Sequence, residues 1–358
     1  MMYIAFRTDA TSQIGTGHFM RCLTLADELK KQGAQIRFVS RDLPDHLRDM
    51  LAAKGMDLVT LKNNASSSQI DDLAHSHWLV TSQAQDAQDT LQALSDQSWD
   101  WMIVDHYALD ARWESKMRGT AKQVMVIDDI ADRQHDCDIL LDQNFYTDMQ
   151  TRYTGKVSAH CQLLLGPRYA LLREEFRKLH EQVQPRTGPV KRILVFFGGV
   201  DADNYTGRAI KALADMDIKG VHVDVVIGAQ HPCRAEIETI SAAQGFACHV
   251  QTDKMAELMA VADLAIGAGG SASWERCCFG LSALLVALAE NQIELAKALD
   301  SIGACIYLGA KDTVNSLTIQ QAITKLLDKP NQIQSISKQA YSLVDGMGVS
   351  RVGQALGC

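Results

Sequence analysis

A glycine-rich turn that contains one histidine is the part of this sequence best suited to chemistry. Residues 7–22 follow a short apolar run, precede a helical pattern and include Gly15, Gly17 and His18. Glycines let backbone approach a ligand closely, and a helix N-terminus attracts anions through its free N–H groups. The same field disfavours an imidazolium, so we expect His18 to be neutral and able to accept a proton. A tight turn carrying a surface histidine would show the same spacing.

A second glycine-rich segment, residues 267–275, also follows an apolar run and opens a helical pattern. Backbone N–H groups at Gly270, Ser271 and Ala272 would be suited to cradle a diphosphate, and the hydroxyls of Ser271 and Ser273 could add donors. Glu275 lies one helical turn further on, where its carboxylate could accept hydrogen bonds from both hydroxyls of a ribose. The alternative for Glu275 is an acid that merely favours the helix dipole.

A third glycine pair, Gly198 and Gly199, ends another apolar run. These glycines suit either the close approach of a ligand or a tight turn. Asp201 and Asp203 superficially resemble the metal-binding Asp-x-Asp of some glycosyltransferases. We interpret them as solvated turn acids, since the surrounding pattern differs.

Polar residues follow two apolar runs of the first half. After the run that ends before Asp105, Tyr107 could hydrogen-bond to a bound sugar or pack against it, whereas we interpret His106 as a structural histidine. Asp128 and Asp129 follow the next run, where paired acids bind a metal, hold a base or cap a helix.

Asn291 and Gln292 precede a helical pattern in the second half. Neutral amides suit sugar hydroxyls because they donate and accept hydrogen bonds, although Asn291 could instead cap the helix. The group that orients His18 is left open, with Asp9 and Ser12 as candidates by their proximity in the sequence.

Short β-branched runs alternate with helical stretches along the whole chain, which predicts parallel sheets covered by helices on both faces. The expected strands fall into two sets. They are 3–6, 35–39, 58–61, 101–104, 123–127 and 139–141, then 192–196, 222–227, 247–251, 264–266, 282–286 and 306–308. The fold class is therefore α/β, with two doubly wound, Rossmann-like domains whose ligands bind beyond the carboxyl ends of the strands, in a cleft between facing domains.

The segment 185–190 holds two of the six prolines and a glycine, which favours a linker. We expect a first domain at 1–184 that carries the histidine and the sugar site, and a nucleotide-binding domain at 191–358. The last helical pattern, 331–356, either crosses back to the first domain or caps its own. The polar stretch 63–68 is expected to be a surface loop.

Composition excludes several classes of protein. The chain has 358 residues, 47% hydrophobic residues and a net charge of -8. This charge argues against nucleic-acid binding, and the sequence shows no signal peptide and no apolar run long enough to span a membrane. Nine scattered cysteines without a Cys-x-x-Cys pair argue against a structural metal. We expect a cytoplasmic protein without stable membrane association, and a monomer.

Five motifs occur in one order along the chain. They are RTDATSQIGTGHFMR (7–21), IVDHY (103–107), CDILL (137–141), YALLREEF (169–176) and GGVD (198–201). Together they resemble the UDP-2,4-diacetamido-2,4,6-trideoxy-β-L-altropyranose hydrolases of pseudaminic acid biosynthesis, the PseG family. The wider relatives of that family are GT-B glycosyltransferases of the MurG type.

The resemblance implies an enzyme that removes UDP from a nucleotide sugar by attack of water at the anomeric carbon, with inversion and without a metal or other cofactor. It implies His18 as the general base. It implies that Gly17, Tyr107, Asn291 and Gln292 line the sugar site. The second domain would hold UDP, with Glu275 at the ribose and Gly198, Gly199, Gly269, Gly270 and Ser271 near the nucleotide.

Two alternatives are kept. A GT-B glycosyltransferase would use a sugar or lipid acceptor in place of water, and fold alone does not separate the two. A non-catalytic nucleotide-sugar binding protein would be expected to keep the diphosphate turn and lose the histidine, whereas His18 is present.

Overall fold

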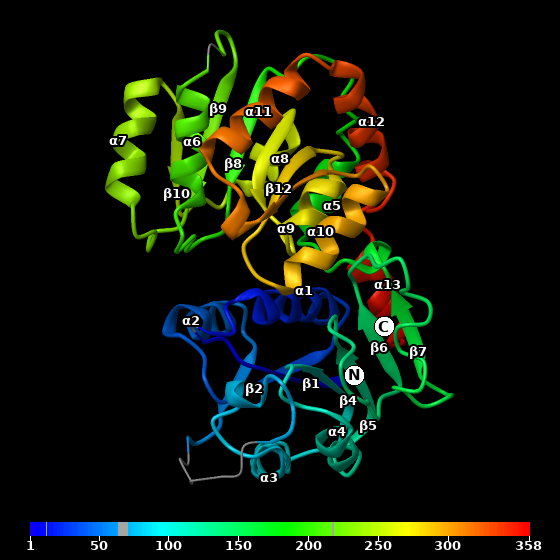
Figure 1. Ribbon diagram of the computed structural model, residues 1–358. Helices are drawn as coiled ribbons and strands as arrows, with labels where there is room; N and C mark the ends of the chain where they lie inside the picture. Colours follow the sequence, from blue (N-terminus) through cyan, green and yellow to red (C-terminus); the bar gives the residue numbers. More distant parts are fainter. Residues whose placement is uncertain (12, 64–70, 217) are drawn as a thin grey trace. The chain divides into compact units, whose positions relative to one another are not determined.

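The computed structural model describes residues 1–11, 13–63, 71–216 and 218–358, so most of the polar stretch 63–68 lies outside the described residues. The chain forms two compact units, each built around its own sheet (Figure 1). The first unit contains Met1–Asn144, Asp148–Leu171 and Gly348–Cys358. The second contains Phe145–Thr147 and Leu172–Met347.

The first unit has a seven-stranded sheet of order β3-β2-β1-β4-β5-β6-β7 in which every pairing is parallel. The predicted strands of the first half are all present, and β7 is an additional edge strand. The elements of this unit are β1 (Tyr3–Thr8), α1 (Gly17–Lys31), β2 (Gln35–Ser40), α2 (Asp45–Ala53), β3 (Asp57–Thr60), η1 (Ser76–Trp78), α3 (Gln83–Ala93), β4 (Trp99–Asp105), α4 (Ala111–Met117), β5 (Ala121–Ile127), β6 (Ile139–Asp142), β7 (Gln162–Leu165), η2 (Pro167–Tyr169) and α13 (Gly348–Ala355).

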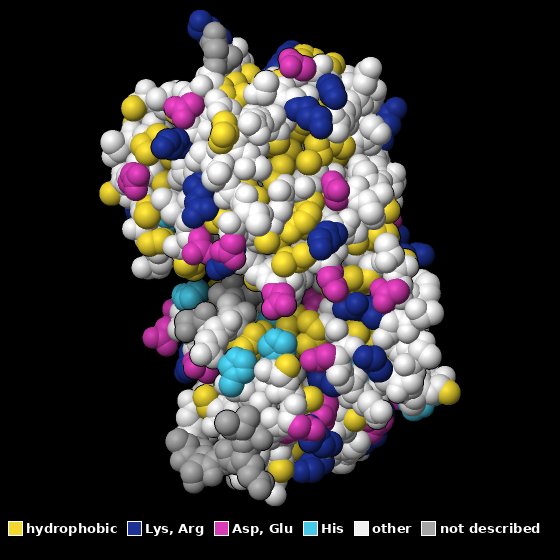
Figure 2. Space-filling model, in the orientation of Figure 1, with side chains coloured by type: hydrophobic (Ala, Val, Ile, Leu, Met, Phe, Trp, Pro, Cys, Tyr) yellow, Lys and Arg dark blue, Asp and Glu magenta, His cyan; other side chains and the backbone are white. Residues whose placement is uncertain are grey.

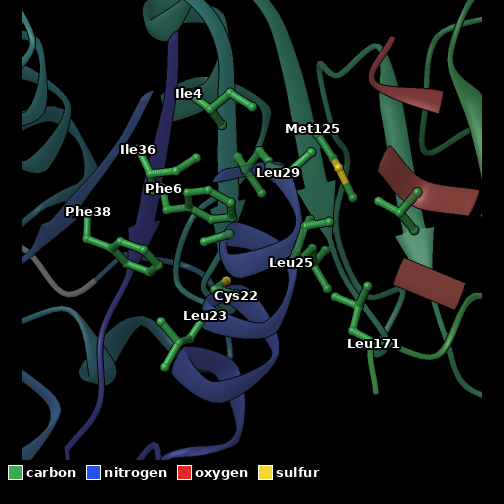
Figure 3. Close-up of a cluster of buried hydrophobic side chains, with 14 of the residues drawn as sticks. Ile4, Phe6, Cys22, Leu23, Leu25, Leu29, Ile36, Phe38, Met125 and Leu171 are labelled. Atoms are coloured by element: carbon green, nitrogen blue, oxygen red, sulfur yellow. The ribbon is translucent and has the colours of Figure 1, made fainter. Parts of the chain in front are cut away.

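Helix α1 is fixed to this sheet by one apolar face. Leu25 and Leu29 lie among Ile4 and Phe6 of β1 in the buried cluster shown in Figure 3. Burying a side chain of this size contributes about 1.5–3 kcal/mol. The last turn of α1 carries Lys30 and Lys31, whose charges suit the negative end of the helix dipole. The start of α1, and with it the histidine, is thereby held against the sheet.

The second unit has a six-stranded sheet of order β10-β9-β8-β11-β12-β13, again parallel throughout. Every strand predicted for the second half is found. The elements are α5 (Glu174–His180), β8 (Arg192–Phe196), α6 (Tyr205–Ala214), β9 (His222–Ile227), α7 (Arg234–Gln244), β10 (Ala247–Val250), α8 (Met255–Val261), β11 (Leu264–Ala268), α9 (Ala272–Cys278), β12 (Ser282–Ala287), α10 (Asn291–Ser301), β13 (Ile306–Ala310), η3 (Lys311–Thr313), α11 (Ser316–Leu327) and α12 (Pro330–Tyr341).

Each sheet contains one point at which the strand order reverses direction. It lies between β1 and β4 in the first unit, and between β8 and β11 in the second. Ligands of open α/β sheets bind beyond the carboxyl ends of the strands at such points. The two strongest glycine-rich segments of the sequence follow β1 and β11, so each lies at one of these positions.

The structure divides the chain elsewhere than at the expected linker 185–190. The chain passes from the first unit to the second between Leu171 and Leu172. Within the second unit, the buried side chain of Arg186 donates hydrogen bonds to carbonyls at the end of α8, including those of Met259 and Ala262 at 3.0 and 2.9 Å. Carbonyls at a helix end lack intrahelical partners, so a guanidinium can hold this irregular segment in place.

The last helical pattern is split between the two units. Helix α12 belongs to the second unit, and Gly348–Cys358 belongs to the first. Helix α13 packs on α1 there, and Nε1 of Trp101 donates to the carbonyl of Leu356 at 3.1 Å. Of the two alternatives for this segment, the structure therefore shows the return to the first unit. None of the described helices has the length and apolar composition that crossing a bilayer requires.

Candidate functional site

His18 is held by a carboxylate from the neighbouring strand. It is the second residue of α1 and is 9% exposed. Its Nδ1 lies 2.5 Å from Oδ1 of Asp105, the last residue of β4. Because β4 pairs with β1, the sheet order brings together residues 87 positions apart in the sequence. A proton on Nδ1 that is donated to Asp105 leaves Nε2 as the basic nitrogen.

Arg21 keeps this carboxylate charged. It lies one turn after His18 on α1, and its Nε and Nη2 donate to the two oxygens of Asp105 at 2.5 and 2.7 Å. Burial would raise the pKa of Asp105, but the Arg21 guanidinium outweighs burial and holds that pKa well below its ordinary value. Asp105 is therefore an anion that orients the imidazole and stabilises its protonated form.

Asp129 extends the same network. It accepts a hydrogen bond from Nη1 of Arg21 at 2.9 Å, from Nδ2 of Asn144 at 3.2 Å and from the hydroxyl of Tyr107. Burial, and then the negative charge of Asp129, raise the pKa of Tyr107, so its hydroxyl stays a donor. The Tyr107 ring meets the His18 ring edge to face, with centroids 4.6 Å apart. Of the two roles expected for Tyr107, packing remains available, because its hydroxyl is committed to Asp129.

Asp9 and Ser12 are the two candidates, by proximity in the sequence, for orienting His18. Asp9 lies in a separate buried network, where it accepts from Ser40 Oγ at 2.8 Å and lies 3.2 Å from Nε2 of His106. Asp105 orients His18 instead, so the candidate Asp9 is wrong. Ser12 lies outside the described residues. His106 is buried beside Asp9, which agrees with its interpretation as a structural histidine.

Gly17 leaves open space at the start of α1. A Cβ built on this residue meets no heavy atom within 4 Å, and the residue is exposed. The backbone beside His18 is thus accessible to a ligand, as close approach to a helix N-terminus requires.

The glycine turn after β11 becomes more exposed from Gly269, which is buried, to Ser271, which is exposed. Gly270 has φ +111, a conformation that favours glycine, and Ser271 is exposed at the N-cap of α9. A Cβ on Gly269 would lie 3.3 Å from Cβ of Gln292, so Gln292 lies beside this turn. Its Oε1 accepts a hydrogen bond from the backbone of Leu288 at 3.0 Å, which fixes the amide.

Arg276 places a buried positive charge under this turn. Its Nη2 donates to the carbonyl of Ala268 at 2.6 Å and to Ser273 Oγ at 3.1 Å. No ion pair between Arg276 and a carboxylate is found in the part of the chain that the structure describes. Burial lowers the pKa of Arg276, because a buried guanidinium is costly to keep charged.

Glu275 directly precedes Arg276 on α9. Its carboxylate is 3.7 Å from Nη2 of Arg173, and burial raises its pKa. This position in the first turns of the helix is compatible with both roles considered for Glu275, binding of the ribose hydroxyls and a favourable charge at the start of the helix dipole.

Gly198 and Gly199 follow β8, on the other side of the reversal point from β11. Gly198 has φ +106, and a Cβ on either glycine meets nothing within 4 Å. Asp201 is buried, and its two oxygens accept from the backbone of Tyr205 and Thr206 at 2.9 and 2.7 Å. The interpretation of Asp201 as a solvated acid is therefore wrong, because it is buried and binds the first two N–H groups of α6, whose N-cap is Asn204.

Asn291 and Gln292 begin α10. Glu290 occupies the N-cap position without a side-chain hydrogen bond, and Asn291 is exposed. The alternative role of Asn291 as the helix cap is thus not seen. Its amide is exposed next to Gln292, which itself contacts the glycine turn.

The predicted site residues form one group in each unit. The first unit joins Gly17, His18 and Tyr107, and the second joins Gly269, Gly270, Ser271 and Gln292. Sequence reasoning missed the roles of Asp105, Arg21 and Arg276. A signal existed for Arg21, since a spacing of three residues places it on the helix face of His18. Within the described ranges, no cluster of three His, Cys, Asp or Glu side chains is arranged to hold a metal ion.

Comparison with known proteins gives the same fold. Residues 192–348 match the model of the glycosyltransferase family 28 C-terminal domain. MurG of Acinetobacter baumannii has a similar structure, with a TM-score of 0.67 and 16% identity over 100% of this chain and 99% of MurG. The chain therefore has the GT-B fold, and the predicted fold class is confirmed.

Two curated relatives are similar in sequence. The spore coat polysaccharide biosynthesis protein SpsG of Bacillus subtilis is 24% identical over 98% of this chain and 96% of its own length. The UDP-2,4-diacetamido-2,4,6-trideoxy-β-L-altropyranose hydrolase of Campylobacter jejuni is 28% identical over 57% of this chain and 62% of its own length.

Proposed function

We propose that the protein hydrolyses UDP-2,4-diacetamido-2,4,6-trideoxy-β-L-altropyranose to UDP and 2,4-diacetamido-2,4,6-trideoxy-L-altrose. The observation that carries the proposal is the His18–Asp105 pair at the reversal point of the first sheet, where Nε2 of His18 has no partner among the described residues. The similarity to the hydrolase of Campylobacter jejuni supports this choice of substrate.

His18 acts as the general base in this reaction. Its Nε2 takes a proton from water while the water oxygen attacks the anomeric carbon. The bond from that carbon to the diphosphate oxygen breaks, its electrons leave with UDP, and the configuration at the carbon inverts. Asp105 is a positioning residue that holds the imidazole and stabilises the imidazolium.

The leaving group needs little help from an acid. The second pKa of a phosphate lies at about 6, so UDP departs as an anion. Backbone N–H groups at Gly270, Ser271 and Ala272, together with the buried charge of Arg276, stabilise that anion without requiring a metal ion. No cofactor is needed for the chemistry.

The remaining residues bind the two ends of the substrate. Glu275 accepts from the ribose hydroxyls, and Gly198 and Gly199 let the nucleotide approach β8. Gly17, Tyr107, Asn291 and Gln292 contact the sugar. In this proposal the protein is a monomer that works in the cytoplasm on a small-molecule substrate, with neither nucleic acid nor a membrane as partner.

A glycosyltransferase is the second candidate, and the match to a glycosyltransferase family model favours it. The same histidine would then deprotonate an acceptor hydroxyl in place of water. Fold alone does not decide between these reactions.

An NMR experiment separates the candidates. The protein is incubated with the proposed UDP-sugar and EDTA, without an acceptor. We expect release of UDP and of free sugar that first appears as the inverted anomer. Intact substrate that nonetheless binds the protein would overturn the hydrolase and favour the transferase or another native sugar.

A further inference from the structure

Trp78 differs from every other tryptophan of the chain. Trp99, Trp101, Trp113 and Trp274 are at most 4% exposed, whereas Trp78 is half-buried. Its indole therefore keeps an accessible apolar surface. Aromatic surface left in contact with water is costly to stability, and it commonly serves in binding.

This surface lies beside the histidine of the candidate site. The Trp78 ring is nearly parallel to that of Tyr107, with centroids 5.3 Å apart, and its centroid is 5.9 Å from that of His18. The ring of His75 is 4.8 Å from Trp78. Figure 2 shows histidine side chains next to apolar atoms on the visible surface of the first unit. Trp78 and His75 thus belong to the same group of rings as the proposed base.

The segment that carries these rings is fixed. Trp78 ends η1, and its backbone donates to the carbonyl of His75 at 2.9 Å. Leu79 follows as a buried anchor in the core cluster of this unit. Nearby, Nε2 of Gln83 donates to Asp71 at 2.8 Å, which ties the preceding residues to α3. The exposed indole is therefore held in place.

His75 offers an unused polar atom next to this indole. Its Nδ1 is shielded from solvent and has no hydrogen-bond partner among the residues that the structure describes. Burial lowers the pKa of His75, so the imidazole is neutral and one ring nitrogen can accept a hydrogen bond. A buried polar atom without a partner is costly, and a ligand N–H or O–H can remove that cost.

We propose that Trp78 and His75 form the surface that recognises the sugar. The indole packs against the apolar C–H face of the hexose and its C6 methyl group, and His75 accepts a hydrogen bond from an acetamido N–H. This inference rests on the proposed function, because it names the part of that substrate which the first unit selects. A 6-deoxy, diacetamido sugar has the methyl and amide groups that these two side chains can bind.

Kinetics and NMR test this inference separately from the reaction. Kinetics compare the wild type with Trp78→Ala, Trp78→Phe and the matched surface variant Val80→Ala, since Val80 is 53% exposed in the same segment. We expect Trp78→Ala to raise KM for the UDP-sugar about tenfold with kcat changed less than about threefold, and Trp78→Phe to restore most of the loss. Val80→Ala should match the wild type.

The NMR arm needs no turnover. Saturation transfer from protein to the UDP-sugar is measured in a His18→Gln background, with and without Trp78→Ala or His75→Phe. We expect Trp78→Ala to weaken transfer to the C6 methyl protons, and His75→Phe to weaken transfer to an acetamido methyl. Transfer to the uracil protons should stay the same.

The outcomes distinguish the two proposals. Hydrolysis by the wild type together with an unchanged KM and unchanged methyl transfer in Trp78→Ala would overturn the sugar-recognition surface alone. Absence of hydrolysis with methyl transfer that depends on Trp78 would overturn the reaction and retain the surface. A parallel loss of methyl and uracil transfer in Trp78→Ala would show that the residue only maintains the fold.

Discussion

The reversal points of the two sheets use different parts of the polypeptide. Between β1 and β4, the first unit gathers His18, Arg21 and Asp105, whose side chains are joined by hydrogen bonds and ion pairs. Beside β11, the second unit has a turn built from glycines, with Arg276 buried next to it and donating to the carbonyl of Ala268.

Under the proposed function, this difference follows from what each chemistry needs. Moving a proton requires a side chain whose ionisation and direction are controlled, which demands partners such as Asp105. Holding a diphosphate requires N–H groups that can come close to it, which demands the absence of side chains. The comparison predicts that substitutions in the network of His18 and Asp105 lower kcat and that substitutions in the glycine turns of the second unit raise KM.

Replacement of His18 should have the largest effect. His18→Gln removes the base but keeps a polar side chain, so we expect kcat to fall about 10²- to 10⁴-fold while UDP binding stays unchanged. Turnover and calorimetric UDP binding measure the two properties. His160→Gln is the matched control, because the side chain of His160 is 59% exposed in the same unit. Near-normal turnover in His18→Gln would remove His18 from the mechanism.

Asp105→Asn should have the next largest effect. The amide keeps the shape but loses the negative charge that stabilises the imidazolium, so we expect kcat to fall about 10- to 100-fold with little change in KM. Arg21 keeps its contact with Asp129, which limits the loss of stability.

Steady-state kinetics and thermal unfolding of Asp105→Asn would be compared with those of Asp96→Asn, a surface acid that pairs with Arg37. A variant of Asp105 with full kcat and a native melting temperature would contradict its positioning role.

Gly199→Val tests the second unit. A Cβ at Gly199 meets no atom within 4 Å, so the larger side chain should leave the fold intact and block the nucleotide. We expect KM for the UDP-sugar and Kd for UDP to rise about tenfold, with kcat nearly unchanged. Gly188→Val is the matched control, since a Cβ there also meets nothing. Equal KM values for the two variants would exclude Gly199 from nucleotide binding.

The smallest effect concerns the acids along the first sheet. Burial, and then the charge of Asp129, raise the pKa of Asp142 to about 8. An unfolded aspartate ionises near pH 4, so the folded state holds one extra proton between about pH 4 and pH 8, and stability falls as pH rises through that window. The variant Asp142→Asn cannot ionise at this position, so its free energy of unfolding should depend less on pH. We expect the slopes of the wild type and the variant to differ by about 1 kcal/mol per pH unit.

Urea unfolding of the wild type and Asp142→Asn at pH 5, 6 and 7 measures this difference. Asp45→Asn serves as the control because the side chain of Asp45 is fully exposed. Parallel stability curves for the wild type and Asp142→Asn would show that Asp142 is ionised in the folded protein.

The apolar pattern of the sequence was sufficient to predict where most strands lie, because buried parallel strands are continuous apolar runs. Strand β7 (Gln162–Leu165) was missed, since it is a short, partly exposed edge strand that no regular helix precedes. The boundary between the units was placed too late, because prolines at 185–190 resemble a linker while Arg186 binds that segment to the second unit.

Sequence alone places candidate residues together where one segment carries them, as at Gly17 and His18. The partner of His18 could not be predicted in this way, because Asp105 reaches it only through the pairing of β1 with β4. Sequence proximity favoured Asp9 instead, which the fold directs into another network. The role of Arg276 could not be predicted for a similar reason, because it depends on the burial of this side chain next to a turn that lies earlier in the chain.

The return of Gly348–Cys358 to the first unit has a consequence for biosynthesis. These residues leave the ribosome after the entire second unit, so the first unit waits for its last helix while the second can already fold. Gly348 packs so closely on Ala170 that a Cβ would overlap its carbonyl. Almost all of the second unit, Leu172–Met347, is thus inserted between two points of the first unit that lie next to each other, and a chain that joins Leu171 directly to Gly348 would contain the histidine-bearing unit without it.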